Sequence, residues 1–308
     1  MRQSIALFVC ISFLATDAAP SYAACGFSKA FTRPDEKGKV QVQVFEGMSE
    51  PALGGARALA FVSSLKVNTD GTSRSYHVRD PRAQKLAIND MRNAMRSGST
   101  IADFEAIAAA DWTPVNKAWS IVSASVIEKD KLTGKPCVTA EGFMVSMTSD
   151  FAVNGASSRM GDCDQKKWID ALVVPALVLP KPNPSGSKTQ FDSRGAGNRS
   201  AVVAMTLDGN DRLAFGIVGD RGPANELGEA SVEMNRMLNG LPAGTIPTNY
   251  SDAKARFQAP RSVVLIFPGQ AARMARPIDA GIPGRVKTLF DAWGGAERLK
   301  GCLSELGA

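Results

Sequence analysis

The alternation of apolar and polar residues predicts strands along much of the chain. Residues 39–45, KVQVQVF, alternate with a period of two, which is the pattern of a strand with one buried face. Further segments that are apolar or rich in β-branched residues are also predicted as strands: 56–67 (one strand or a pair), 118–127, 142–147, 171–179 (a pair interrupted by Pro175) and 262–267. Strands therefore dominate the predicted structure.

A hairpin is predicted around residue 209. Residues 201–207 and 212–219 are two apolar segments that flank the turn cluster Asp208-Gly209-Asn210-Asp211. This cluster contains the Asp-Gly pair that tight hairpin turns favour. The second strand of the hairpin is expected to end at Asp220.

Helices are expected where apolar residues recur every three or four positions. The segments with this spacing are 83–95, 100–110 after a cap at Ser99 or Thr100, a helix from Glu229 to a stop at Gly240 and Pro242, and 285–306 with a break or kink at Gly294-Gly295.

Together these elements predict a mainly β protein, of the β-rich α+β class, with peripheral helices. The strands on either side of the long polar segment 180–200 look like parts of one sheet, so we interpret that segment as an insertion and not as a domain linker. No repeat of fixed period is visible, and the pattern favours a small barrel over a parallel βαβ sheet. Residues 24–308 are expected to form a single domain.

Residues 1–23 have the organisation of a secretory signal peptide. Arg2 precedes a short apolar run, and Ser21 and Ala23 are small residues at the two positions that signal peptidase reads. Tyr22 stands where a lipobox has an aliphatic residue, which disfavours acylation of Cys25. The apolar run is too short for a permanent membrane span, and no later segment is long enough. We therefore expect a secreted or periplasmic protein without a membrane span.

The cysteines and the histidine limit the chemistry. Four cysteines follow the predicted cleavage site, and in an oxidising compartment they would form two disulfides in one of three pairings: Cys25, Cys137, Cys163 and Cys302. None of them has C-x-x-C spacing, which argues against a metal site. His77 is the only histidine, so a His-rich zinc or iron site is excluded. We expect chemistry based on carboxylates, without a metal or another cofactor.

Composition and charge bear on the partners. Hydrophobic residues make up 44% of the chain and charged residues 21%, which is typical of a folded globular protein. The net charge of +6 favours anionic surfaces in a general way. However, the basic residues are scattered and form no nucleic-acid-binding motif. We expect a monomer that does not bind nucleic acid.

Residues 219–231, GDRGPANELGEAS, contain the best candidates for catalysis. Asp220 is predicted at the end of a buried strand beside a Gly222-Pro223 turn, and burial disfavours its charged form. Glu229 is predicted in the first turn of a helix, where the helix dipole favours its ionised form. Such a pair suits glycoside hydrolysis, with Asp220 as general acid and Glu229 as general base. Glu226, in mid-loop, is expected to be solvated.

These residue types also have structural interpretations. An Asp before Gly-Pro commonly starts a turn, and the helix dipole alone favours a Glu in a first helical turn. Trp112, Trp119 and Trp168 could stack on sugar rings or belong to the core. His77 near Asp80 could activate a serine, but the chain has no G-x-S-x-G elbow, so a structural or cleft-lining histidine is the better interpretation.

Three blocks together resemble the glycoside hydrolase family 75 chitosanases, with the best match over residues 170–231: DALVVPALVLP (170–180), AVVAMTLDGNDRLAFGIVGD (201–220) and the GDRGP…GEAS segment. The resemblance implies a six-stranded double-psi β-barrel. It also implies an endo-acting enzyme that cleaves β-1,4 linkages of chitosan with inversion, and that Asp220 and Glu229 are its catalytic pair.

An earlier segment, NTDGTSRSYH (68–77), is similar to one in bacterial members of that family. This similarity implies that Asp70, Tyr76 and His77 are cleft residues that contact the substrate.

The charge of the chain leaves the substrate open. Chitosan is a polycation, whereas this protein is basic and places Arg221, which we also expect to contact the substrate, beside the proposed acid. An enzyme for a cationic polymer should line its cleft with further carboxylates, which four residues could supply: Asp70, Asp162, Asp164 and Asp192. Double-psi barrels also occur in lytic transglycosylases, and anionic peptidoglycan suits a basic protein. The alternative is therefore a peptidoglycan-acting barrel, or a non-catalytic barrel that binds a glycan or a protein.

Overall fold

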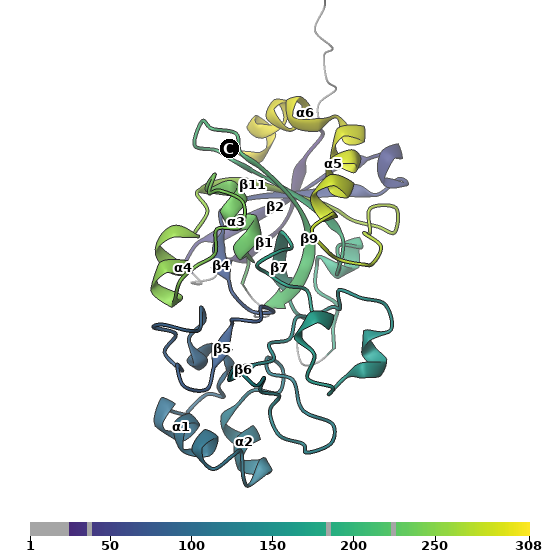
Figure 1. Cartoon of the computed structure of the whole chain (residues 1–308). Coiled ribbons are helices and arrows are strands. Elements are labelled where there is room, and N and C mark those ends of the chain that lie inside the picture. The colour runs from purple at the N-terminus through teal and green to yellow at the C-terminus, as the bar shows by residue number, and fades with distance from the viewer. Residues whose placement is uncertain (1–24, 36–38, 183–185, 223–225) are drawn as a thin grey trace, which may run out of the picture.

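The computed structural model describes residues 25–35, 39–182, 186–222 and 226–308. The predicted signal peptide (1–23) and Pro223 of the predicted Gly222-Pro223 turn lie outside the described residues. Figure 1 shows a strand-rich upper part and a lower part of loops and short helices. No helix within the described ranges is long and apolar enough to cross a membrane.

A mixed nine-stranded sheet forms the upper part, in the order β1-β2-β3-β11-β8-β9-β7-β10-β4. Its strands are β1 (Ser28–Pro34), β2 (Gln41–Ser49), β3 (Arg57–Ser64), β4 (Lys66–Asn68), β7 (Ala176–Pro180), β8 (Ala201–Thr206), β9 (Leu213–Gly222), β10 (Glu229–Ser231) and β11 (Arg261–Phe267). The pairs β7–β9 and β10–β4 are parallel, and the other pairs are antiparallel. The expected mainly β fold and the 201–219 hairpin are confirmed.

The sheet curls so that its first strand approaches one of its last. Asp35, just after β1, forms a parallel bridge with Leu227, just before β10. The backbone N–H of Leu227 donates to the carbonyl of Pro34 at 3.1 Å. This bridge encloses an apolar core that includes Phe61 and Val264 on the inner face of the sheet.

Both faces of the sheet are buried at its centre, as β8 shows. Val202 and Ala204 belong to the inner core, whereas Val203 and Met205 pack against a second cluster on the outer face. Two helices cover that outer face, α5 (Ile282–Trp293) and α6 (Gly295–Gly301), as seen at the top of Figure 1. Successive side chains in a strand point to opposite faces, and both faces of β8 are buried. The sequence of β8 is therefore almost continuously apolar.

The predicted break in the last helix is confirmed. Gly294 separates α5 from α6 and has φ of 123°, a conformation that other residues rarely adopt. Two more helices, α3 (Val232–Leu238) and α4 (Tyr250–Arg256), lie near β4 and β10.

The lower part contains α1 (Ile101–Ala109), α2 (Val115–Ile121) and the two-stranded sheet of β5 (Tyr76–His77) and β6 (Phe143–Met144). The helix predicted over 100–110 is confirmed. Thr100 is its N-cap, and its hydroxyl and the Asp103 carboxylate form a capping box.

Some predicted elements of the lower part are wrong. The strand predicted over 118–127 is wrong: residues 118–121 are the end of α2, and the residues after them form a turn. Ala118 and Ile121, three residues apart, both enter an apolar cluster with Phe104 of α1. The helix predicted over 83–95 is an irregular loop with only a short 3-10 turn at its end. The Asp80 carboxylate accepts hydrogen bonds from the backbone N–H groups of residues 84–87 and so replaces the helical pattern.

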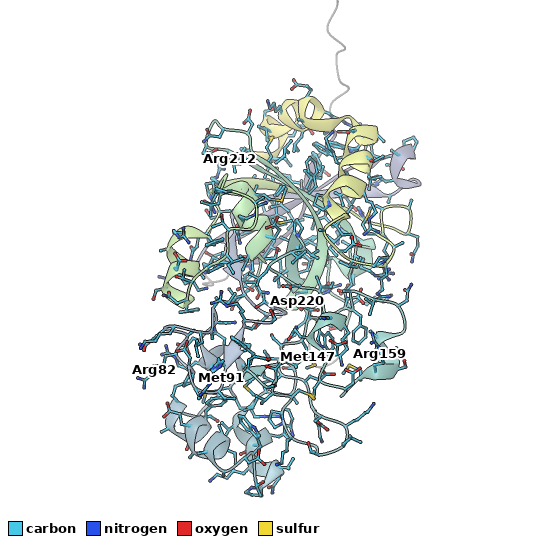
Figure 2. The ribbon with its side chains drawn as sticks, in the orientation of Figure 1. Arg82, Met91, Met147, Arg159, Arg212 and Asp220 are labelled. Carbon is cyan, nitrogen blue, oxygen red and sulfur yellow. A yellow bond between two sulfur atoms is a disulfide. The ribbon has the colours of Figure 1, made fainter. Side chains whose placement is uncertain are left out.

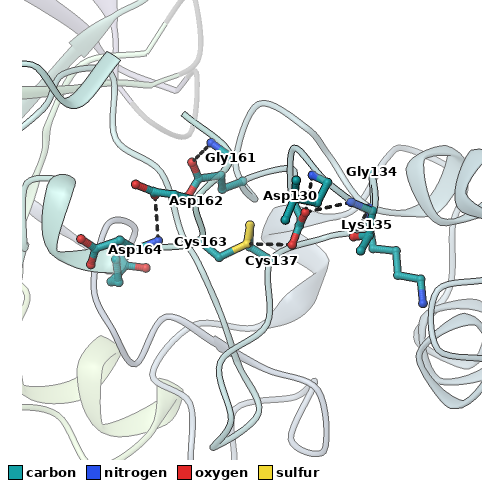
Figure 3. The surroundings of a disulfide bond; sticks show 12 residues. Asp130, Gly134, Lys135, Cys137, Gly161, Asp162, Cys163 and Asp164 are labelled. Carbon is teal, nitrogen blue, oxygen red and sulfur yellow. Dashed lines mark hydrogen bonds between the residues drawn. A yellow bond between two sulfur atoms is a disulfide. The ribbon is translucent and has the colours of Figure 1, made fainter. Parts of the chain in front are cut away.

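The cysteines pair as Cys25–Cys302 and Cys137–Cys163, which selects one of the three possible pairings. The first disulfide joins the beginning of the described chain to the end of α6. The second joins two loops of the lower part, and its surroundings are shown in Figure 3.

Candidate active site

A cleft of about 610 Å³ lies where the sheet meets the lower part. The sheet contributes Asn68, Asp220 and Glu229, among others, and the lower part contributes Asn89, Met147 and Ser149. Figure 2 shows Asp220 at the end of β9 near the lower part, where Met147 is labelled. The cleft is also lined by two residues of α4, Tyr250 and Lys254, and by Lys181, which follows β7.

Strand register places Asp220 and Glu229 on one wall of this cleft. Asp220 in β9 pairs with Val178 of β7, and Glu229 in β10 pairs with the same Val178 from the other side. The two carboxylates therefore occupy equivalent positions on strands that flank β7. Neighbouring strands lie about 4.7–4.9 Å apart, so the two Cα atoms are separated by roughly 10 Å.

Glu229 lies in a strand, which corrects the predicted helix start. It belongs to β10, and helix α3 begins at Val232, where the Ser231 hydroxyl accepts a hydrogen bond from the N–H of Met234. β10 extends as a strand because β4 and β7 supply hydrogen-bonding partners on its two sides. The helix dipole therefore does not explain a base role for Glu229, and that part of the sequence argument is wrong.

Gly222 leaves space beside the Glu229 carboxylate. A Cβ atom at this position would lie 2.9 Å from Val178 Cγ1 and 3.4 Å from Glu229 Oε2. Glycine therefore allows the Glu229 carboxylate to lie close to β9.

The Asp220 carboxylate is held in a fixed orientation. Its Oδ1 accepts hydrogen bonds from the backbone N–H groups of Ser149 and Arg221, each at 2.8 Å, and its Oδ2 lies 3.5 Å from the Asn68 amide nitrogen. Burial, and to a smaller extent the nearby negative charge of Asp70, raise the pKa of Asp220 to about 7. The direction of this shift agrees with the expectation that burial disfavours the charged form of Asp220.

Asp70 belongs to a buried polar network beside Asp220. Its Oδ1 accepts hydrogen bonds from the Tyr76 hydroxyl and, at 3.1 Å, from the Asn89 amide, which also donates to the Tyr76 oxygen at 2.8 Å. Asn68 links the two acids, because its Oδ1 accepts from the backbone N–H of Asp70 at 2.8 Å. Burial raises the pKa of Asp70, and its hydrogen bonds act in the opposite direction.

Asp70 and Asp220 also share a small hollow beneath the cleft. This hollow has a volume of about 10 Å³, and both residues line it. That is close to the space that one water molecule needs.

The charge of Arg221 is compensated within the protein. Its guanidinium donates to the Asp192 carboxylate at 2.6 Å, to the Pro180 carbonyl at 3.1 Å and to the Asn198 side chain at 3.0 Å. Arg221 lines the cleft, but Asp192 forms an ion pair with it. Asp192 is not among the described residues that line the cleft, so it compensates Arg221 and is not one of the additional cleft carboxylates expected from the sequence.

His77 and Tyr76 are buried beneath the cleft and are not among the described residues that line it. Tyr76 reaches the site through its bond to Asp70. His77 Nδ1 accepts from the backbone N–H of Arg79 at 3.1 Å, and Nε2 lies 2.9 Å from the carbonyl of Glu141. Both ring nitrogens are thus engaged by backbone groups, as in a structural histidine.

Other candidates from the sequence lie elsewhere. Asp162 forms an ion pair with the buried Lys167, and Asp164 caps a short 3-10 turn. Among the described residues, the cleft is lined by no tryptophan. Trp112 and Trp168 are buried.

Several polar residues of the cleft were missed by the sequence analysis. Asn68, Asn89 and Ser149 orient the acids, and Lys181 and Lys254 bring positive charge. Only Asn68 had a sequence indication, because it directly precedes the Thr-Asp-Gly turn.

Within the part of the chain that the structure describes, no three His, Cys, Asp or Glu side chains gather in a way that could hold a metal ion. Comparison with protein-family models finds no family that matches the chain, and no curated protein matches it. The cleft itself contains an acid whose pKa is raised to about 7 and a second carboxylate across one strand from it.

Proposed function

We propose that this protein is an endo-glycosidase that hydrolyses β-1,4 linkages of chitosan or a related amino-sugar polymer with inversion. One observation carries the proposal: Asp220 and Glu229 flank Val178 on one wall of a cleft, and the pKa of Asp220 is about 7. The resemblance to the family 75 chitosanases identifies the same two residues.

The spacing suits an inverting mechanism. Inverting glycosidases hold their two carboxyl groups about 6.5–9.5 Å apart, which leaves room for a water molecule, whereas retaining enzymes hold them about 5 Å apart. Asp220 and Glu229 are separated by an intervening strand, with Cα atoms roughly 10 Å apart, which leaves room for a carboxyl separation in the wider range.

In the proposed reaction, protonated Asp220 donates its proton to the glycosidic oxygen as the bond to the anomeric carbon breaks. Glu229 accepts a proton from a water molecule that attacks the opposite face of that carbon. The products are a free hydroxyl on one fragment and an inverted anomeric hydroxyl on the other. Exchange of protons with solvent then restores the starting ionisation of both residues.

The same resemblance underlies our proposal that the curled sheet is a double-psi β-barrel. The bridge between Asp35 and Leu227 and the parallel β7–β9 pair support this finer assignment. We also propose that the protein is exported after cleavage of residues 1–23, which its two disulfides support.

Charge in the cleft bears on the substrate. Two carboxylates, Asp70 and Glu229, lie in the cleft beside Asp220, which is protonated when it acts as the acid, and Arg221 is paired with Asp192. This favours an amino sugar at the centre of the cleft. Lys181 and Lys254 also line the cleft, and their positive charge would suit an anionic glycan. Peptidoglycan is therefore the second candidate substrate.

The wild-type protein should be assayed on chitosan and on peptidoglycan, with the anomer of the new reducing end followed by NMR from the first minutes. We expect reducing ends to form on chitosan with the α anomer appearing first, because a β linkage is inverted. Initial release of the β anomer would contradict the mechanism. Activity on peptidoglycan alone would favour the second candidate, and no activity on either polymer would favour a non-catalytic binding protein.

Replacing Asp70 with asparagine should change the pH dependence of the reaction. The negative charge of Asp70 raises the pKa of Asp220, so its removal lets Asp220 lose its proton at lower pH. We expect the alkaline limb of the kcat/KM profile to move to lower pH by about one unit, equivalent to about 1.4 kcal/mol. An unmoved alkaline limb with a uniform loss of activity would indicate that Asp70 only supports the local structure.

A further inference from the structure

A second hollow continues the cleft on the side of the lower part. It has a volume of about 530 Å³ and shares Met147 with the cleft. Ala124 lines this hollow, whereas its two neighbours, Ser123 and Ser125, line the cleft. A polymer that extends beyond the cleft on this side would therefore pass over Met147 into the second hollow.

Two apolar side chains are exposed in this hollow. Leu132 has 88% of its surface exposed and Met160 has 44%. We call this site the Leu132 hollow and define it by Ala124, Leu132, Met147 and Met160. Apolar side chains that gather at a hollow commonly mark a ligand-binding surface.

The turn that carries Leu132 has a defined conformation. The Asp130 carboxylate accepts hydrogen bonds from the backbone N–H groups of Leu132 at 2.7 Å and Thr133 at 2.9 Å, and the N–H of Gly134 donates to the Asp130 carbonyl at 2.9 Å. The disulfide Cys137–Cys163 lies next to this turn (Figure 3). Leu132 is therefore presented to solvent by an ordered turn.

The segment that carries Met160 is attached to the same turn. The N–H of Lys131 donates to the carbonyl of Gly161 at 2.9 Å, and the N–H of Gly161 donates to the buried Glu128 carboxylate at 2.7 Å. Glu128 forms an ion pair with Lys167, and both side chains are fully buried. The two walls of the Leu132 hollow are thus held together before any ligand binds, which reduces the entropy lost on binding.

Charge in the Leu132 hollow differs from charge in the cleft. Lys129 and Lys131 line the hollow. Asp130 is the one acid among the described lining residues, and its carboxylate accepts hydrogen bonds from the backbone N–H groups of the turn. Positive charge and apolar surface disfavour a glucosammonium unit. They favour a neutral unit that carries an apolar group, as N-acetylglucosamine does with its methyl group.

We propose that the Leu132 hollow is an outer subsite that binds N-acetylated units of the polymer, beyond the site of cleavage. This inference rests on the proposed function, because the occupant is taken to be the same chain that the cleft holds. The protein would then prefer a partly acetylated polymer over a fully deacetylated one, with acetylated units bound away from the acids of the cleft.

Binding to the Asp220→Asn variant tests this subsite without depending on turnover. The probes are a partly N-acetylated chitosan hexasaccharide and a disaccharide, measured by calorimetry with and without the added substitutions Leu132→Ser and Met160→Ser. We expect the added substitutions to weaken hexasaccharide binding about tenfold or more, as the burial of two apolar side chains predicts, and to leave disaccharide binding unchanged. The matched control is Leu86→Ser, which alters another exposed leucine that is not among the described lining residues of either site.

Equal hexasaccharide affinity with and without the added substitutions, or no measurable binding of the hexasaccharide, would overturn the subsite. A fully deacetylated hexasaccharide is measured in the same way, and equal affinity of the Asp220→Asn variant for the two hexasaccharides would overturn the selectivity of the hollow for acetyl groups. Failure of the proposed function would appear differently, as a wild-type protein that binds the hexasaccharide but does not hydrolyse it.

Discussion

Replacing Asp220 with asparagine is expected to lower kcat/KM on the polymer by about 10²–10⁴-fold, the usual contribution of a positioned general acid. Asparagine has nearly the same shape and keeps an oxygen that can accept the hydrogen bonds from Ser149 and Arg221. It has no acidic proton to donate to the leaving oxygen. The loss should therefore appear in kcat without a comparable change in substrate affinity.

The pH profile of the wild-type protein should follow the same residue. Only protonated Asp220 can act as the acid, and its pKa is about 7, so kcat/KM should fall as the pH rises through about 7. The Asp220→Asn variant should lack this alkaline limb in its residual activity.

The stability of this variant should change in the opposite direction from its activity. Between about pH 4 and pH 7 the folded protein keeps the Asp220 proton that the unfolded chain releases, so wild-type stability falls as the pH rises through this range. The shift of about three units corresponds to at most about 4 kcal/mol. Asparagine removes this ionisation, so the variant should gain stability relative to the wild type from pH 4 to pH 8, as denaturant unfolding would measure.

Asp170→Asn is a matched control for both effects. Burial also raises the pKa of Asp170, but this residue is not among the described residues that line the cleft. The control should keep full activity. If Asp220→Asn retained wild-type activity while folding normally, Asp220 would not be the acid.

Replacing Glu229 with glutamine is expected to reduce kcat/KM to a similar extent, about 10²–10⁴-fold, because the amide cannot accept a proton from the attacking water. The substitution preserves the size of the side chain next to Gly222. Activity should be measured on the polymer that the wild-type protein hydrolyses, and the unfolding temperature of the variant should be measured alongside it.

Glu226→Gln is the control for Glu229. Glu226 lies three residues earlier in the same connection and is not among the described residues that line the cleft. It should leave activity within a few-fold of wild type. Full activity in Glu229→Gln, or an equal loss in Glu226→Gln, would contradict the base assignment.

Local sequence patterns predicted the elements whose geometry is decided by local interactions. The hairpin around Asp208-Gly209 and the helix capped by Thr100 are confirmed, because turn residues and capping groups act within a few positions. The break at Gly294 is confirmed for the same reason. Asp220 was also placed correctly near the end of its strand.

Elements decided by distant partners were predicted poorly. Glu229 was assigned to a helix because the following residues have helical spacing, but β4 and β7 bind its backbone as a strand. The segment 118–127 was assigned to a strand because it is apolar, but residues 118–121 pack against α1 as the end of a helix. Propensity is a weak guide where tertiary contacts supply the larger free energy.

The sequence by itself determined a β-rich chain, its main hairpin and its last helices, because these follow from periodicity and turn chemistry. It also offered the two carboxylates worth testing, through residue type together with the resemblance of the surrounding blocks. Only the tertiary structure decided that Asp220 and Glu229 flank Val178, that Asp70 lies beside Asp220, and that Asp192 neutralises Arg221. Those relations join residues that are far apart in the chain. They arise from strand register and from the burial of charged groups, neither of which a local pattern specifies.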